Sequence, residues 1–571
     1  MSGYSYWSTL QRRALSRRRF VIGGAAIGSA AALACSSRPS TAPAGSPGAT
    51  GAQGTPKSGG TYSTFWTANP VLDTQKGSAP PFQAAAGVLS RLFRFKTGAD
   101  PKTSTDHDLE TDLAISAESP DAVTWTVKLR PDARFHNVPP VNGHAVEGED
   151  VKATFARMLD PKTSAPNRGA LTMIDPSQVQ TPDKNTVVFK LAYPYAPFRN
   201  MLASPPYSLI YPREALAGTY DPATRVIGSG PFMLNSLTPD VALVYKKNPD
   251  YFVSGVPNVD QIRLAIIEDP SVQLAQFTGG NLDELPLSTV DDLASMRQRN
   301  PKATVVKAEN ATPFPIYFRL DDPSTPFHDV RVRRAFSMAI DRESFGKAVY
   351  GGEYQTVVFV PSYMGKWSVK VSDLDSTTQQ YYKYNPSEAK KLLEAAGAAN
   401  MQIKVIKISG GPFVAGYLKK SSETIFNMLE AVGIKATLVE ADYTKDFLDA
   451  GRGIKQGFYD KDAVPLCATA SFTDPDEFLF SYFHSKSTSN TERLSDPDLD
   501  AMIDKERTLL NPDERLKAVL DIQKYLADKM YTPSTVSTYR WVLVQPRVRN
   551  YQYTTTPGWI DETYAKLWLE Q

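Results

Sequence analysis

Cys35 ends a short uncharged segment, in the sequence Ala32-Leu33-Ala34-Cys35. A basic stretch followed by an apolar run and small residues is typical of a secretory signal. A cysteine in this position resembles a bacterial lipobox, in which the thiol receives a lipid. The usual box has Leu three places before the cysteine, whereas this chain has Ala32 there and Leu33 one place later. We predict lipid attachment at Cys35, and simple cleavage nearby is the alternative.

The basic stretch contains Arg17 and Arg18, with Ser16 before them and Phe20 soon after. This pair resembles the twin-arginine signal, which exports folded proteins in bacteria. An ordinary secretory signal that happens to be rich in Arg is the alternative. The uncharged run of residues 20–34 is shorter than the roughly twenty apolar residues that span a bilayer. Residues 1–35 are therefore predicted to be an export signal, and the Ser-, Pro-, Ala- and Gly-rich residues 36–57 a disordered linker.

Acidic residues close together could carry out hydrolysis, because glycosidases need two carboxyl groups beside the scissile bond. Asp474, Asp476 and Glu477 are such a group, but acids next to a proline more often cap helices. Gly228-Ser229-Gly230 is not the Gly-x-Ser-x-Gly turn of a serine hydrolase. Cys467 has no sequence signature of a thiol enzyme. We expect the chain not to be an enzyme.

The remaining polar residues exclude several other classes of site. The histidines are His107, His136, His144, His328 and His484. They are not spaced like the ligands of a metal ion, so no metal is expected. No Gly-x-x-x-x-Gly-Lys-Ser/Thr segment is present, so we expect no nucleotide cofactor. Without the five arginines of residues 1–34 the formal charge falls from +2 to −3, which does not suit nucleic acid. If Cys35 carries the lipid, Cys467 is the second and last cysteine of the sequence, and no internal disulfide is expected.

The elements that position these residues can be read from apolar spacing. Val123, Trp125, Val127 and Leu129 alternate with polar residues and predict a strand. Glu149 or Asp150 is predicted to cap the helix that follows. Residues 186–191 predict another strand. This mixed order favours an α/β or α+β region.

The second half of the chain has clearer helix starts. Asp329 precedes an apolar stripe at helical spacing, and three nearby arginines are expected on a solvated face or in ion pairs. Asn385-Pro386 and Asn511-Pro512 each place a capping residue before a proline. Residues 402–408 and 435–439 read as strands that follow helices, the pattern of a wound α/β unit.

Several of these segments together resemble the extracellular solute-binding proteins of ABC importers, in the large family that includes dipeptide, oligopeptide and nickel binders. Each segment alone is a weak signal, but they occur in the family's order across residues 60–571. The matching residues are 124–131 with Phe135-His136, 149–151, Gly228-Ser229-Gly230-Pro231-Phe232, Asn248-Pro249-Asp250-Tyr251-Phe252, 329–342, 384–397 and Asp474-Pro475-Asp476. One departure is a longer, proline-containing insertion at residues 137–143, which is expected to change a loop and not the fold.

This resemblance implies an α/β fold of the periplasmic-binding-protein type, a bilobed clamshell of class C with an extra inserted domain. Carried onto this chain, lobe I comprises residues 58–95, 223–312 and 546–571. The inserted domain comprises 96–222 and lobe II comprises 313–545. The hinge crossings are expected near Thr312 and Pro546.

The resemblance also implies a function. The ligand binds between the lobes, the lobes close, and the loaded protein docks on ABC permease subunits in the membrane. We expect a monomer, exported and held by its lipid on the outer face of the cytoplasmic membrane or in the periplasm. It is expected to bind no nucleic acid.

The resemblance favours peptides as the ligand, and an oligosaccharide or other organic solute is the alternative. Peptide binders of the family place an Asp against the peptide's amino terminus, and at that position this chain has Ser471. Asp474 is the candidate to replace that Asp, but a helix cap is its favoured role. Aromatic residues near the expected cleft also suit sugars. The expected ligand-binding residues are Gly77, Ser78, Tyr317, Phe318, Thr469, Ser471, Phe472 and Asp474.

Overall fold

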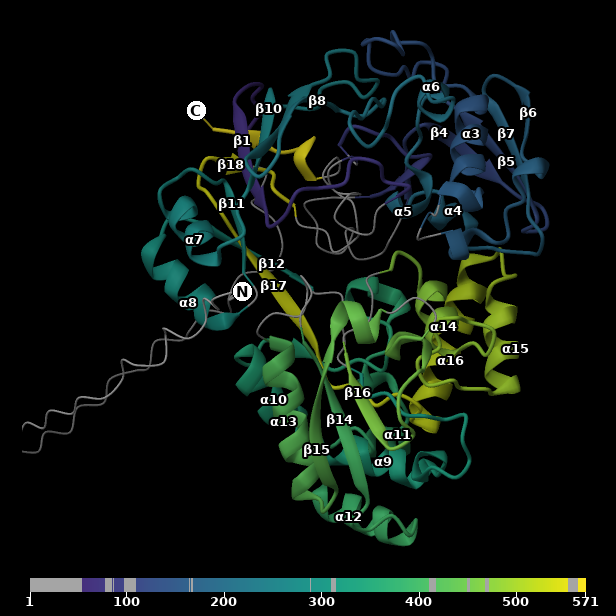
Figure 1. Ribbon diagram of the computed structural model, residues 1–571, viewed down its shortest axis with the longest axis vertical. Helices are drawn as coiled ribbons and strands as arrows, with labels where there is room; N and C mark the ends of the chain where they lie inside the picture. The colour runs from purple at the N-terminus through teal and green to yellow at the C-terminus, as the bar shows by residue number, and fades with distance from the viewer. Residues whose placement is uncertain are drawn as a thin grey trace, which may run out of the picture. The chain divides into compact units, whose positions relative to one another are not determined.

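Figure 1 shows the protein as a computed structural model, in which residues 47–571 form one compact unit. The structure describes residues 54–571 apart from short gaps. These gaps are 77–84, 86, 97–108, 164, 166–167, 288, 310–314, 410–416, 449–451, 468–471, 553–562 and 571. The predicted export signal, with Arg17, Arg18 and Cys35, and most of the predicted linker lie outside the described residues.

The described strands form separate sheets, each built around one part of the chain. The first sheet has the order β1 (Thr61–Trp66), β10 (Gln261–Ile266), β9 (Ala242–Lys247), β8 (Phe232–Thr238). The second has β4 (Ala114–Glu118), β5 (Thr124–Leu129), β7 (Thr186–Lys190), β6 (Gln180–Asp183). The third has β15 (Lys435–Asp442), β14 (Gln402–Ser409), β16 (Ala463–Leu466). The fourth has β11 (Glu284–Leu287), β17 (Ser537–Val544), β12 (Thr304–Glu309), with β13 (Tyr354–Gln355) also on β17. Two pairs complete them: β2 (Phe93–Phe95) with β3 (Leu109–Thr111), and β18 (Val548–Arg549) with β19 (Trp568–Leu569).

Among the described residues, more of the helices lie in the second half of the chain. Those before residue 310 are α3 (Gly148–Leu159), α4 (Phe198–Met201), α5 (Pro205–Ser208), α6 (Arg213–Leu216), α7 (Pro270–Thr278) and α8 (Val290–Arg299). Those after it are α9 (Val330–Ala339), α10 (Arg342–Tyr350), α11 (Ser376–Gln380), α12 (Pro386–Ala395), α13 (Tyr417–Ala431), α14 (Pro475–Phe483), α15 (Pro497–Glu506) and α16 (Pro512–Lys529).

The parallel sheet of β15, β14 and β16 confirms the wound unit predicted from residues 402–408 and 435–439. β14 pairs in parallel with both neighbours, and α13 packs against β14 and β15 (Figure 1). The predicted caps of the surrounding helices are also confirmed. Asp329, Asn385 and Asn511 each accept backbone N–H groups at the start of α9, α12 and α16.

The antiparallel sheet of β4, β5, β7 and β6 packs on α3, and β5 and β7 lie where the sequence predicts strands. The predicted cap of α3 was wrong. The helix begins at Gly148, and its cap is Glu147. Asp150 stands at the third helical position, where its carboxylate accepts the N–H of Glu147 at 2.9 Å. It therefore completes a capping box from inside the helix.

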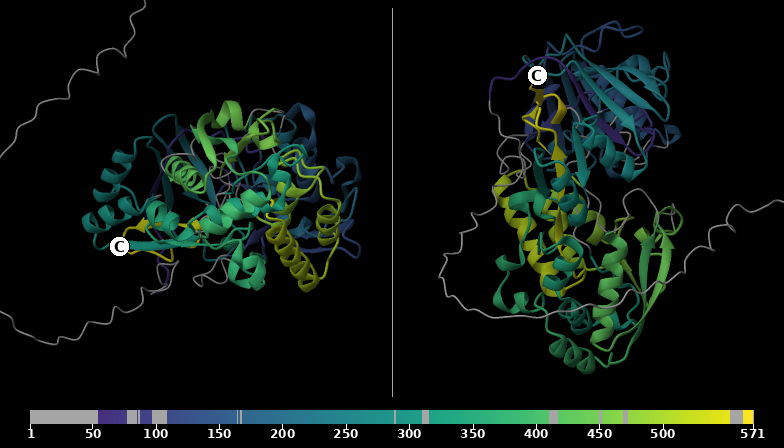
Figure 2. Two further views of the ribbon diagram at one scale, coloured as in Figure 1. Left: turned by 90° about the horizontal axis from the view of Figure 1, so that it is seen from below. Right: turned by 90° about the vertical axis from the view of Figure 1, so that its left-hand side faces the viewer.

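β17 joins parts of the chain that are far apart in sequence. Its later residues pair with both β11 and β12, whereas its first two residues pair with β13. This yellow strand can be followed beside the teal β12 in Figure 1. The chain continues from it to β18 and β19, and the C-terminus is marked in both views of Figure 2.

The described buried apolar side chains gather into four clusters. One runs from Ile316 to Val536 and one from Leu92 to Ile227. The third combines both ends of the chain, from Tyr62 to Leu569. The fourth joins residues 277–296 to Trp541 and Leu543 of β17. Since each cluster excludes water by itself, each can stabilise its own part of the chain.

Two of the matching sequence segments meet in one place. A side chain at Gly228 would put its Cβ 2.0 Å from the carbonyl oxygen of Val88, and at Gly230 it would lie 2.8 Å from that of Gly87. The ring of His136 accepts the N–H of Gly228 at 3.3 Å and donates to the carbonyl of Gly230 at 3.0 Å. The glycines therefore let three backbone segments approach closely, and the histidine fixes them.

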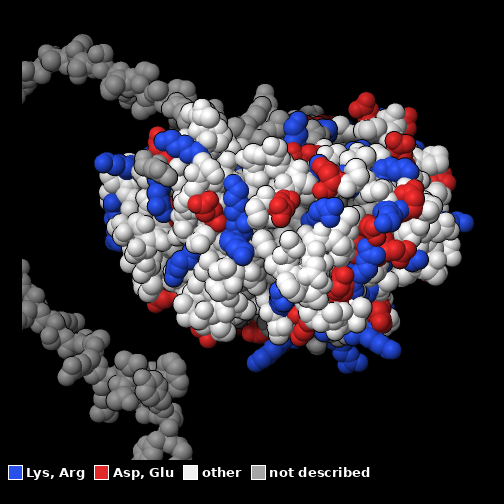
Figure 3. Space-filling model, turned by 90° about the horizontal axis from the view of Figure 1, so that it is seen from above, with Lys and Arg blue, Asp and Glu red and all other residues white. Residues whose placement is uncertain are grey.

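The face in Figure 3 shows Lys and Arg side chains interspersed with Asp and Glu, without either sign gathering in one large area. Within the described residues, every helix falls short of the length and apolar character needed to cross a bilayer.

Candidate functional site

The structure brings two of the expected ligand-binding residues onto one aromatic ring. Tyr317 stacks on Tyr482, with ring centroids 6.2 Å apart and planes 19° apart. Phe472 lies 6.3 Å from the same ring and makes an edge contact of 4.9 Å with Phe478. Tyr317 is 2 % exposed, whereas Phe472 is half-buried. Phe472 is therefore the member of this pair with surface to offer a ligand.

The backbone of Phe472 is fixed by a second tyrosine. The Tyr363 hydroxyl donates to the Phe472 carbonyl at 2.5 Å and accepts the Phe472 N–H at 3.1 Å. Tyr363 is 1 % exposed, and burial raises the pKa of its hydroxyl well above the usual value. It stays a neutral donor and acceptor at ordinary pH, as this double contact requires.

The other expected ligand-binding residues are not part of this group. Phe318 is fully buried between Phe327 and Phe336, at centroid distances of 4.8 and 5.2 Å, in the cluster that begins at Ile316. It offers no surface in this structure. The remaining four lie outside the described residues: Gly77, Ser78, Thr469 and Ser471.

Asp474 has the capping role that competed with ligand binding. It is 2 % exposed and caps α14 by accepting the N–H of Asp476 at 2.8 Å. Its two carboxylate oxygens also accept from the Arg515 guanidinium at 2.5 and 3.1 Å and from the Asn200 amide at 2.7 Å. Because these donors occupy it, Asp474 is not a free anchor for a ligand ammonium group.

Asp474 belongs to a buried cluster of four acids and two arginines. Arg515 also pairs with Glu506 at 2.9 Å, and Arg507 pairs with Asp476 at 3.2 Å. The fourth acid, Glu477, accepts the N–H groups of Thr473 and Asp474 at 2.9 and 3.1 Å. We call these six charged side chains the α14 cluster: Asp474, Asp476, Glu477, Glu506, Arg507 and Arg515.

Burial and neighbouring charges shift pKa values within the α14 cluster. Burial raises the pKa of Glu477 to about 7 and raises that of Glu506 well above its usual range. Asp474 raises the pKa of Arg515 and Asp476 raises that of Arg507, so both arginines keep their charge. Burial acts on the two glutamates because it disfavours the charged form of a carboxyl group.

The α14 cluster also receives three hydrogen bonds from residues 195–207. The Tyr195 hydroxyl donates to Asp476 at 2.9 Å, and the Tyr207 hydroxyl donates to Glu477 at 2.8 Å. The Asn200 amide donates to Asp474, as described above. One polar surface therefore joins the part of the chain around α4 and α5 to the start of α14.

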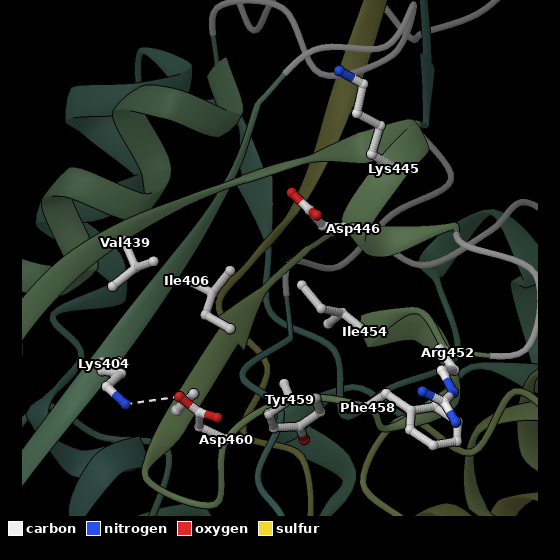
Figure 4. A pocket seen from close by; sticks show the side chains of 11 residues that line it. Lys404, Ile406, Val439, Lys445, Asp446, Arg452, Ile454, Phe458, Tyr459 and Asp460 are labelled. Atoms are coloured by element: carbon white, nitrogen blue, oxygen red, sulfur yellow. Dashed lines mark hydrogen bonds and ion pairs between the residues drawn. The ribbon is translucent and has the colours of Figure 1, made fainter.

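We call the side chains around Phe472 the aromatic group: Tyr317, Tyr363, Phe472, Phe478 and Tyr482. Two pockets lie apart from the aromatic group. One of about 310 Å³ opens beside the parallel sheet, where Lys404 reaches Asp460 at 2.7 Å and Phe458 and Tyr459 line the floor (Figure 4). The other, of about 750 Å³, is lined by residues 341–343, 354–356, 370–372, 379 and 382–384. Neither contains an expected ligand-binding residue.

Among the residues that the structure describes, no three His, Cys, Asp or Glu side chains are placed to hold a metal ion. His136 is 2 % exposed, and its ring bonds to the backbone of Gly228 and Gly230. Burial lowers its pKa to about 4. His107 lies outside the described residues.

Sequence reasoning missed three residues that shape the site. Tyr363 and Tyr482 have no motif of their own, and only the folded chain brings them to Phe472. Arg515 follows Asn511 by four residues and looked like an ordinary residue of a capped helix. One sequence signal could have shown that Asp474 is a helix cap. Glu477 stands three residues after it, which is the spacing of a capping box.

Residues 108–490 match the family described as "Bacterial extracellular solute-binding proteins, family 5 Middle". The chain belongs to this family. It is therefore a family 5 solute-binding protein, and the expected resemblance is confirmed.

Individual relatives agree with this assignment. The di/tripeptide-binding protein 2 of Pseudomonas aeruginosa is 27 % identical over 430 residues, 72 % of this chain and 78 % of that protein. The heme-binding protein A of Haemophilus influenzae is 26 % identical over 503 residues, 84 % of this chain and 86 % of that protein. The ABC transporter substrate-binding protein CtaP of Listeria monocytogenes is 20 % identical, with a TM-score of 0.74 over 90 % of this chain and all of CtaP. The family 5 clamshell predicted from the sequence is thus the fold of this chain.

Proposed function

We propose that this family 5 protein captures peptides outside the cytoplasm and delivers them to an ABC permease. The observation that carries the proposal is the family match over residues 108–490, together with a relative named as a di/tripeptide-binding protein. The two lobes close on the ligand to form the loaded state. The ligand shifts the equilibrium toward this closed state by the free energy of the contacts that it makes only when the lobes are closed. The protein acts by binding and carries out no catalysis.

The aromatic group supports a ligand held through its main chain and apolar side chains. Phe472 presents a half-buried ring, and Tyr363 holds its backbone in place. Since Asp474 is paired with Arg515 and Asn200, a peptide's amino terminus needs another partner. Backbone hydrogen bonds to an extended peptide are the recognition mode that depends least on such an anchor.

The arrangement of the chain is part of the proposal. We assign residues 58–95, 223–312 and 546–571 to lobe I, 96–222 to the inserted domain and 313–545 to lobe II. The clusters at 92–227 and 316–536 support this division. The twin-arginine route and a lipid on Cys35, proposed from the sequence, would hold the protein at the membrane beside its permease.

Mass spectrometry of the co-purified ligand tests the function. Residues 47–571 are purified without added ligand and unfolded, and the released molecules are weighed. A series of peptide masses is expected. Haem, which is suggested by the relative named heme-binding protein A, or masses spaced by hexose units would overturn the peptide assignment.

A further inference from the structure

The start of α14 is held by two parts of the chain that have separate apolar cores. Tyr195 and Tyr207 belong to the cluster between Leu92 and Ile227, whereas Phe478 and Leu479 of α14 belong to the cluster between Ile316 and Val536. Hydrogen bonds connect the two through Tyr195, Asn200 and Tyr207. Polar contacts exchange with water at small net cost, so such a joint can open while both cores stay intact.

These hydrogen bonds act on three acids in succession. Asn200 donates to Asp474, Tyr195 to Asp476 and Tyr207 to Glu477. A backbone contact adds to them, because the N–H of Ala196 donates to the carbonyl of Arg507 at 2.6 Å. The Arg507 guanidinium also lies 5.0 Å from the Tyr195 ring and 4.1 Å from that of Phe480 on α14.

Glu477 connects the hydrogen bond from Tyr207 to the backbone beside Phe472. One of its oxygens accepts from Tyr207, and the other accepts the N–H groups of Thr473 and Asp474 and the Thr473 hydroxyl at 3.0 Å. Thr473 follows Phe472 directly. A fixed Glu477 therefore fixes the backbone just after Phe472, while Tyr363 fixes Phe472 itself.

We propose that Tyr195, Asn200 and Tyr207 form a latch by which residues 195–207 position Phe472 and so set ligand affinity without contacting the ligand. This inference rests on the proposed function for the role of Phe472. The latch residues are positioning residues. Opening the latch releases Glu477, frees the backbone at Thr473 and Asp474, and lets the two apolar clusters separate.

Tyr207→Phe and Asn200→Ala test the latch. Asn200 is only half-buried, so its variant retains the fold even if Tyr207→Phe does not. Tyr525→Phe is the matched control: its hydroxyl donates at 2.8 Å to Asp496, the cap of α15, and both residues lie in the second half of the chain. Each variant thus loses one hydrogen bond to a helix-capping or cap-region carboxylate.

The first readout needs no ligand. Hydrogen exchange of the Thr473 and Asp474 amides is measured in purified residues 47–571. We expect about tenfold faster exchange in both latch variants, the change that accompanies loss of one charge-assisted hydrogen bond. No change in Tyr525→Phe is expected. Equal exchange in latch and control variants would overturn the proposal.

A second readout compares the two clusters directly. Spin labels are placed at the exposed positions Lys184 and Lys517, whose side chains are 80 % and 78 % exposed. The latch variants should broaden the distance distribution between these labels, and the control should leave it unchanged. A distribution that stays as narrow as that of the parent protein contradicts the latch.

Affinity is then measured with a mixture of random tripeptides. We expect the latch variants to bind about tenfold more weakly than the parent protein. The affinity of the control variant should equal that of the parent protein. If the parent protein binds no tripeptide, the peptide assignment fails, and the exchange and label measurements still decide whether the latch exists. Parent-like affinity in variants that exchange faster would overturn the role of the latch in binding.

Discussion

At the scale of single residues, several matching sequence segments carry buried polar groups that bond to the protein's own backbone. The His136 ring bonds to backbone groups of Gly228 and Gly230. Arg342 is 6 % exposed and donates to the carbonyls of Ser337, Tyr382 and Ser534. These side chains hold backbone segments together, which explains why they stand in motifs although they lie outside the aromatic group.

His136 makes stability depend on pH. Its folded pKa of about 4 lies below the unfolded value of about 6.5, so the unfolded chain binds the proton first as pH falls. Its stabilisation is present above pH 6.5 and is lost toward pH 4, with about 2 kcal/mol lost between pH 7.5 and 5. Urea unfolding of His136→Gln should show a smaller loss over this range than the parent protein. His144→Gln, which changes a partly exposed ring, is the control. An equal pH dependence in parent and His136→Gln would exclude this role.

Arg342→Lys should destabilise the protein by about 2 to 3 kcal/mol. A lysine has one nitrogen in place of the planar fork, so it leaves some of the buried carbonyls unpaired. Burial already lowers the pKa of Arg342 to about 10, which reflects the cost of keeping this charge inside. Thermal unfolding measures the change. Arg331→Lys, at a side chain 46 % exposed, should stay within about 0.5 kcal/mol of the parent. Similar losses in the two variants would contradict the argument.

The sequence predicted the candidate site only in part, for a physical reason. Tyr317, Phe472 and Asp474 were predicted from the family resemblance, and of these Asp474 stands in one of the matching segments. Whether Asp474 is free depends on Arg515 and Asn200, which approach it only in the folded chain. Tyr317 and Phe318 are both buried in the cluster that begins at Ile316, which no local sequence signal distinguishes from a position on the surface of a cleft.

At the scale of elements, close backbone packing restricts which residues can stand at positions 228 and 230. Gly228 and Gly230 pass against Gly87 and Val88, where no Cβ fits. Gly397, by contrast, ends its helix with a φ of +69°, and open space surrounds it. Glycine is thus needed at the first site for close approach and at the second for backbone conformation.

Gly228→Ala should destabilise the chain by more than about 4 kcal/mol, because the clash is with backbone that cannot move aside. Gly169→Ala is the matched control, since no atom lies within 4 Å of its added Cβ. Thermal unfolding and yield of folded protein are the measurements. A Gly228→Ala protein that melts with the control would show that the three segments can separate at little cost.

Helix starts were the most predictable elements. A capping Asp or Asn followed by proline or an apolar stripe located α9, α12 and α16 from local chemistry alone. The start of α3 was misplaced because Glu147, Glu149 and Asp150 are all acidic, and only the structure shows which one lies outside the helix. The pairing of β17 with β11, β12 and β13 has no local signal, since its partners are up to about 260 residues away.

At the scale of the whole molecule, the proposed lipid on Cys35 decides where the protein works. Cys35→Ala should move the protein from the membrane fraction to the aqueous fraction, because the variant lacks the thiol that would carry the lipid. Fractionation followed by detection of the protein measures this, and Ser36→Ala is the control. A Cys35→Ala protein that stays with the membrane would contradict lipid attachment at this residue.

The cluster that combines Tyr62 with Leu569 sets the order in which the protein can be completed during synthesis. The clusters at 92–227 and 316–536 are each finished when their own stretch of chain has left the ribosome. The third cannot close until Leu569 has been translated, and until then β1 lacks part of its apolar cover. A chain shortened before β19 therefore exposes apolar surface around β1, which chaperones and proteases can recognise.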